Sequence, residues 1–109
     1  MPNTLATRHC THRTGPALTP AEAAALLAGV PGWSLGAEAK TIEREFRFTD
    51  YYETVAFVNA VAWIIHAQDH HPDLEVGYNR CRVRFSTHSV KGLSENDFIC
   101  AAKVDALRD

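Results

Sequence analysis

The amino-acid sequence predicts an α+β fold: a four-stranded antiparallel sheet with helices packed on one face, in the order α-β-β-α-β-β-α. Residues 41–48 and 80–87 alternate between apolar and charged side chains, which is typical of half-buried strands. Between them, residues 51–65 carry apolar side chains at helical spacing. The expected hairpins favour antiparallel pairing with the helices on one side.

The chain is expected to form one domain behind a short lead-in. Its 109 residues, 46% hydrophobic and 22% charged, suffice for a single hydrophobic core. In residues 1–18, polar side chains together with Gly15 and Pro16 interrupt any periodicity, so we predict a flexible N-terminal segment there. Residues 19–109 are then the folded domain.

The first helix and the first two strands have clear boundary signals. Thr19 can cap the helix, Pro20 suits its first position, and Glu22 completes a capping box. The helix should end at its breakers, Gly29, Pro31 and Gly32. Residues 33–35 can begin a strand. The next strand has one apolar face, made of Ile42, Phe46 and Phe48. Arg44 breaks this pattern.

The strongest helical signal lies in residues 51–65. Thr49 or Asp50 can cap this helix. A stripe at helical spacing consists of Tyr51, Val55, Val58, Ala62 and Ile65, and it is widened by Phe57, Val61 and Ile64. One helix of so small a protein rarely buries so wide a face against its own sheet, so the excess predicts a contact between subunits. The segment 69–72 must end the helix, because the residue before Pro72 disfavours helical dihedral angles.

A hairpin and a last helix complete the predicted order. Residues 74–78 and 80–87 should pair around Asn79. The second of these strands has an apolar face of Cys81, Val83 and Phe85 and a basic face of Arg80, Arg82 and Arg84. Ser94 and Asp97 resemble a capping box at the start of the last helix.

Charge and hydropathy exclude several classes of partner. The net charge is −2, from 11 basic and 13 acidic residues, which gives no electrostatic reason to expect nucleic acid or an anionic membrane. No apolar run approaches the roughly 20 residues that a membrane helix needs. The first residues lack the apolar centre of a secretory signal. We therefore expect a cytoplasmic protein with no nucleic-acid and no membrane partner.

The three cysteines do not predict a disulfide framework or a zinc site. They cannot all pair within one chain, and their spacing lacks a C-x-x-C motif. We interpret Cys81 and Cys100 as small buried hydrophobes. The run His9-Cys10-Thr11-His12 offers soft-metal ligands, but no fourth ligand is evident, so we expect no metal there.

Four of the six histidines lie between positions 66 and 88. His66 and His70 are four residues apart, on one face of the end of the long helix. His71 precedes a proline, and His88 ends the final strand. If that strand lies against the long helix, one cavity could hold several imidazoles together with Asp97. Imidazoles suit proton transfer near neutral pH, and two of them on opposite sides of a flat substrate could act as acid and base.

Each of these residues also has a simpler interpretation. His70 could balance the helix dipole, His71 could be a turn residue, and Asp97 could only cap the last helix. Trp33 could belong to the core. A zinc site would use the H-x-x-x-H pair with His88 or Asp97, but no glutamate accompanies the pair as in H-E-x-x-H, so we predict no metal.

The same residues follow a fixed spacing: His66-Ala-Gln-Asp-His70-His71-Pro72, then Tyr78, His88 and Asp97. This pattern resembles the signature of the pterin-4a-carbinolamine dehydratase family, and the resemblance runs from about residue 18 to residue 107. The run 89–98 is similar to that of bacterial members, in which the enzyme partners phenylalanine hydroxylase. Two positions depart from many animal members, which carry glutamate in place of His66 and arginine in place of Asn96.

The resemblance implies a reaction and a set of roles. Family members dehydrate 4a-hydroxytetrahydropterin, the product of aromatic amino acid hydroxylases, to quinonoid dihydropterin, and they need no further cofactor because the pterin is the substrate. By this resemblance His70 and His88 are the acid/base pair, and His71 binds and orients the ring. The expected supporting or substrate-binding residues are Asp97, His66, Trp33, Pro72, Ser86 and Thr87.

The resemblance also implies an assembly and an alternative function. In the family, subunits pair their sheets into dimers and pack long helices into tetramers, so we expect a homo-oligomer. Some relatives act as dimerisation cofactors of a transcription factor, and a carboxysomal branch with a degraded His-His-Pro element assists Rubisco assembly. The intact run 70–72 favours the enzyme over such a non-catalytic assembly factor.

Overall fold

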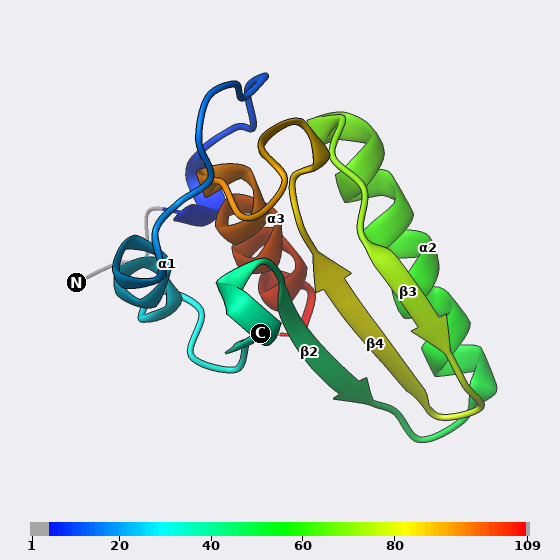
Figure 1. The fold of residues 1–109 in the computed structure, drawn as a ribbon. Coiled ribbons are helices and arrows are strands. Elements are labelled where there is room, and N and C mark those ends of the chain that lie inside the picture. The colour runs from blue at the N-terminus through cyan, green and yellow to red at the C-terminus, as the bar shows by residue number, and fades with distance from the viewer. Residues whose placement is uncertain (1–4, 109) are drawn as a thin grey trace.

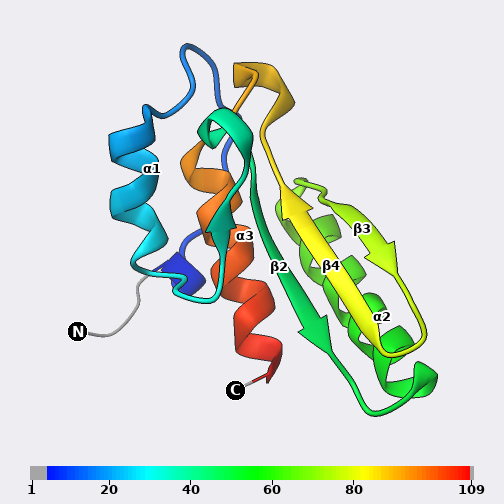
Figure 2. The same cartoon turned by 60° about the horizontal axis from the view of Figure 1, so that its bottom comes forward.

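The computed structural model describes residues 5–108 and contains one four-stranded antiparallel sheet with the strand order β1-β2-β4-β3 (Figure 1). The helices are α1 (Pro20–Leu27), α2 (Tyr51–Gln68) and α3 (Glu95–Asp105), and the strands are β1 (Ser34–Leu35), β2 (Ile42–Arg47), β3 (Asp73–Val76) and β4 (Arg80–Phe85). This confirms the predicted α+β class and element order. Figure 2 shows α2 running beneath β3 and β4, and α3 beside β2.

The sheet has one buried and one charged face, as the alternation predicts. Register pairs Ile42 with Phe85 and Phe46 with Cys81 across the central strands, and all four are buried. Arg44 shares this covered face, where its guanidinium bonds Asp105 Oδ1 at 2.7 Å and lies 4.5 Å from the centroid of the Phe46 ring. An ion pair and an aromatic ring therefore accommodate the residue that breaks the pattern.

The other face of the sheet is balanced in charge rather than basic. Arg82 lies opposite Glu45 on β2 and Glu75 on β3, with nitrogen–oxygen distances of 3.4 and 3.5 Å. Arg84 lies 3.8 Å from Glu43. The basic stripe predicted on β4 is therefore matched by acidic residues on both neighbouring strands.

The long helix buries only part of the predicted apolar stripe against its own domain. Its N-cap is Asp50, whose side chain accepts the Glu53 N–H. The buried residues of α2 are Thr54, Phe57 and Val61, whereas Tyr51 and Ala62 of the predicted stripe are exposed. Phe57 packs on Phe46 and Phe48 and thereby sets which side of the helix meets the core, and the predicted contact of the remaining apolar surface with another subunit stays a prediction. No described helix is long and apolar enough to cross a membrane.

Residues 5–18 lie against the domain. Leu5 is buried in the core, Lys103 Nζ donates to the Ala6 carbonyl at 2.9 Å, and the Leu18 N–H donates to the Leu93 carbonyl at 2.9 Å. The predicted flexibility of residues 1–18 stays a prediction, and its first four residues lie outside the described part of the chain. At residue 19 the predicted capping box of α1 is present, with Thr19 and Glu22 bonded reciprocally.

Candidate active site

A pocket of about 290 Å³ opens where the C-terminal end of α2, the loop after β4, the start of α3 and the N-terminal segment meet. Its lining residues are mostly of polar type and include four histidines. The lining residues are Cys10, Thr11, His12, Arg13, Gln68, Asp69, His70, His71, Ser86, Thr87, His88, Ser89 and Asn96. Its size lies at the lower end of small-molecule sites, which suits a compact ring system.

His70 reaches into this pocket because of the way that α2 ends. The helix stops at Gln68, and Asp69 takes a left-handed conformation with φ 52°, which redirects the chain. Nε2 of His70 then lies 2.6 Å from Oδ1 of Asp97, and the imidazole stacks on Phe85 with ring centroids 5.9 Å apart. Only 11% of the side chain is exposed. Burial disfavours the charged ring, but the hydrogen bond and the charge of Asp97 outweigh it, so the pKa of His70 is raised.

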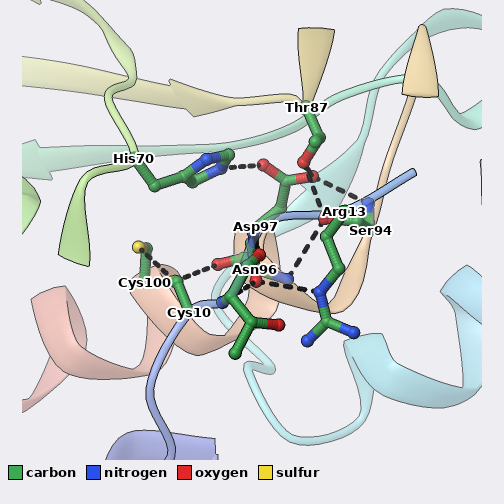
Figure 3. Close-up of polar contacts among 9 residues, drawn as sticks. Cys10, Arg13, His70, Thr87, Ser94, Asn96, Asp97 and Cys100 are labelled. Carbon is green, nitrogen blue, oxygen red and sulfur yellow. Dashed lines mark hydrogen bonds and ion pairs between the residues drawn. The ribbon is translucent and has the colours of Figure 1, made fainter. Parts of the chain in front are cut away.

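Asp97 is fully buried and has a hydrogen-bonding partner on each carboxylate oxygen (Figure 3). Oδ2 accepts the Ser94 N–H at 3.0 Å and the Thr87 hydroxyl at 2.8 Å, while Oδ1 faces His70. The first of these contacts belongs to the predicted capping box of α3. Asp97 therefore caps the helix and holds His70 at the same time, so the simpler interpretation explains only one of its three contacts.

His71 and His88 form a second, solvent-exposed pair that lines the same pocket. Their rings are stacked with centroids 5.9 Å apart and planes 22° apart. His88 opens a 3-10 turn after β4 rather than ending the strand. Ser86 and Thr87, also expected at the site, line the pocket beside it.

Four expected site residues do not line the pocket, and one of them, Asp97, is the buried partner of His70. His66 is exposed on α2, and the predicted shared helix face with His70 is wrong because the helix ends two residues before His70. Trp33 is 3% exposed in the core, where its Nε1 donates to Asp105 Oδ1 at 2.9 Å. Pro72 lies half-buried just after His71.

One wall of the pocket, residues 10–13, was not predicted from the sequence. Gln68 and Asn96 hold this wall: Gln68 Oε1 accepts the Cys10 N–H at 2.8 Å, and Asn96 bonds both backbone groups of Thr11. Hydropathy gave no signal here because the segment has no periodicity. The density of histidine, cysteine and arginine in residues 8–13 was the one available indication of chemistry.

The cysteines behave largely as predicted. Cys81 and Cys100 are buried, and burial raises the pKa of the Cys81 thiol. The sulfur of Cys100 lies 3.5 Å from that of Cys10, and this contact lowers the pKa of Cys10 and raises that of Cys100. Within residues 5–108, no three histidine, cysteine, aspartate or glutamate side chains are grouped as metal ligands.

The fold and the site define a class of protein: a small α+β domain with several imidazoles and a buried carboxylate around one pocket. A family model for pterin 4 alpha carbinolamine dehydratase matches residues 16–107. Proteins named for this dehydratase in Nitrosospira multiformis and Xanthomonas campestris pv. campestris are 56% and 60% identical over 106 and 103 residues. These matches cover 94% and 93% of this chain and 91% and 87% of the relatives. The chain therefore belongs to the pterin-4a-carbinolamine dehydratase family, a family of enzymes.

Two solved structures share the fold. A transcriptional coactivator/pterin dehydratase from Brucella melitensis has a TM-score of 0.81 at 32% identity and covers 85% of this chain and 99% of its own. A pterin dehydratase-like protein described as a RuBisCO assembly factor in the alpha-carboxysome has a TM-score of 0.61 at 25% identity, covering 70% of this chain and 88% of its own.

Proposed function

We propose that this protein dehydrates 4a-hydroxytetrahydropterin to quinonoid dihydropterin and so recycles the pterin cofactor of aromatic amino acid hydroxylases, with phenylalanine hydroxylase as its functional partner. The observation that carries the proposal is the buried His70–Asp97 pair, which opens into the same pocket as His71 and His88. The family membership supports the same reaction.

The reaction needs two proton transfers and no change of oxidation state. A ring-nitrogen lone pair expels the hydroxyl from C4a, the leaving oxygen takes up a proton to depart as water, and a ring N–H loses a proton. Acid–base side chains suffice for these steps. We therefore infer that the pterin is the substrate and that neither a metal nor a further cofactor takes part.

The two environments of the histidines suggest which group donates the proton. Asp97 occupies Nε2 of His70 and stabilises the imidazolium, so Nδ1 is the nitrogen left to protonate the leaving hydroxyl. His88, exposed across the pocket, accepts the proton from the ring. His71, stacked beside His88, binds and orients the pterin.

The exposed side of α2 supports the predicted association of subunits. Tyr51 is 49% exposed and Trp63 is 77% exposed on this helix, which is unusual for large apolar side chains of a monomer. We infer a homotetramer built on α2, acting in the cytoplasm. Sedimentation at micromolar concentration should show a tetramer or a dimer, and a stable monomer would refute the inference.

The direct test of the function is the dehydration of enzymatically generated 4a-hydroxytetrahydropterin with and without the protein. The proposal requires a rate well above the spontaneous one for the wild-type protein, unchanged by chelator. A wild-type rate equal to the spontaneous rate would contradict it and would favour a non-catalytic assembly role.

A further inference from the structure

The pocket has a wall that lies outside the span matched by the family model, which begins at residue 16. Residues 10–13 form this wall, and hydrogen bonds fix its backbone. Asn96 Nδ2 donates to the Thr11 carbonyl at 2.7 Å, Asn96 Oδ1 accepts the Thr11 N–H at 3.2 Å, and Ser89 Oγ donates to the Arg13 carbonyl at 2.8 Å. A wall held in this way is ordered before substrate arrives, which lowers the entropic cost of binding.

Arg13 is the cationic side chain that this wall brings to the pocket. Its Nε donates to Asn96 Oδ1 at 3.1 Å, which leaves both Nη groups for other acceptors (Figure 3). Across residues 5–108, no carboxylate lies within ion-pair distance of Arg13; Glu95 pairs with Arg8, although the charge of Arg13 also helps to lower the pKa of Glu95. A guanidinium does not release its proton in proteins, so Arg13 is suited to binding rather than to acid–base chemistry.

A pterin offers a matching acceptor. Its pyrimidine half carries a carbonyl oxygen at C4, the atom next to the reacting C4a. The histidines that would act at C4a line the same pocket as Arg13. A guanidinium on the carbonyl side would bind the ring without competing for the protons that the histidines transfer.

We propose that Arg13 is a substrate-binding residue that donates hydrogen bonds to the C4 carbonyl of the pterin, and that Asn96 is the residue that positions it. The inference rests on the proposed dehydratase function and adds the atom by which the substrate is recognised. It also assigns Asn96 a role, since this side chain is 5% exposed and its amide oxygen and nitrogen contact Thr11 and Arg13.

The first test compares two arginines of the same segment. Arg13→Ala should raise KM for 4a-hydroxytetrahydropterin about 10- to 100-fold with little change in kcat, because a charged hydrogen bond to bound substrate is lost. Arg13→Lys should be intermediate. The matched control is Arg8→Ala, which removes an exposed ion pair outside the pocket and should leave KM within about twofold.

The second test identifies the recognised atom and the role of Asn96. Wild-type protein should bind pterin more tightly than 2,4-diaminopteridine, which has a donor in place of the carbonyl, and Arg13→Ala should lose most of this preference. Asn96→Ala should raise KM in the same direction, and the double variant should raise KM by less than the two single effects combined, because Asn96 acts in part through Arg13. Thermal unfolding of each variant shows whether the fold persists.

The outcomes separate this inference from the proposed function. If wild-type protein dehydrates the substrate and Arg13→Ala matches Arg8→Ala in KM and in ligand preference, the inference is wrong and the function stands. If wild-type protein neither binds pterin nor accelerates dehydration, both are wrong.

Discussion

The pocket holds the same kind of side chain in two opposite environments. His70 is nearly buried, bonded to a fully buried carboxylate and stacked on Phe85. His71 and His88 are exposed and contact each other through their ring faces. Imidazoles whose environments differ in this way can carry out opposite proton transfers at one pH. We infer from this contrast that the local partner of each histidine, rather than the residue type, determines its proposed role in proton transfer.

The largest expected effect comes from removing the proposed proton-transfer groups, His70 and His88. His70→Ala or His88→Ala should lower kcat by about 10²–10⁴-fold with folding little changed. The double variant should approach the spontaneous rate. Substrates of each C4a configuration would sharpen the comparison, since each single variant should impair one configuration more. If both single variants keep full turnover on both configurations, the histidines are structural and the comparison fails.

The next largest effect is a loss of stability when the buried carboxylate of Asp97 is removed. Asp97→Ala leaves His70 Nε2, the Thr87 hydroxyl and the Ser94 N–H without their acceptor, which should cost about 3–5 kcal/mol in the free energy of unfolding. Urea unfolding measures this cost. The control Asp73→Ala removes an exposed carboxylate and should change stability by less than about 0.5 kcal/mol.

This stability difference should depend on pH in a defined direction. Because the folded pKa of His70 is raised, the contribution of the pair is complete below the unfolded pKa of about 6.5 and is lost as pH rises through the folded value. The difference in unfolding free energy between wild-type protein and Asp97→Ala should therefore become smaller toward alkaline pH. It should not reach zero, because Asp97 of the wild-type protein still accepts hydrogen bonds from Thr87 and Ser94. A difference in unfolding free energy that grows with pH would contradict the assignment of His70 as the titrating partner of Asp97.

The smallest effect is expected from replacing His71, one of the two exposed histidines. His71→Ala should raise KM about tenfold while kcat changes little, because a contact that positions bound substrate acts on the ground state and the transition state alike. His9→Ala, which removes an exposed histidine that does not line the pocket, is the matched control. A fall in kcat with unchanged KM would instead make His71 a participant in proton transfer.

Local signals in the sequence predicted most of the fold. The capping boxes at Thr19 and Ser94 and the alternation in β2 and β4 depend on neighbouring residues, so they can be seen without the tertiary structure. The side of α2 that packs inward could not be predicted in this way. Apolar residues surround much of that helix, and the packing of Phe57 on Phe46 and Phe48 sets which of them meet the core.

The candidate site was predictable to a similar extent. The motif spacing predicted that the central histidines and Asp97 lie close together. In the structure the three histidines line one pocket, and Asp97 contacts His70. The expected place of His66 depended on a helix extending to residue 70, and the left-handed Asp69 ends it earlier. The wall at residues 10–13 depends on long-range bonds to Gln68 and Asn96, which have no periodic signature in the sequence.

The dependence of kcat/KM on pH, compared between wild-type protein and Asp97→Asn, tests the proposed role of the buried pair most directly. If His70 is the acid, activity requires its protonated form, so the wild-type rate should fall on the alkaline side only above the ordinary histidine pKa of about 6.5. Asparagine keeps the shape of Asp97 but removes the charge that stabilises the imidazolium, so the alkaline limb should move to lower pH. An alkaline limb at the same pH in both proteins would contradict the account.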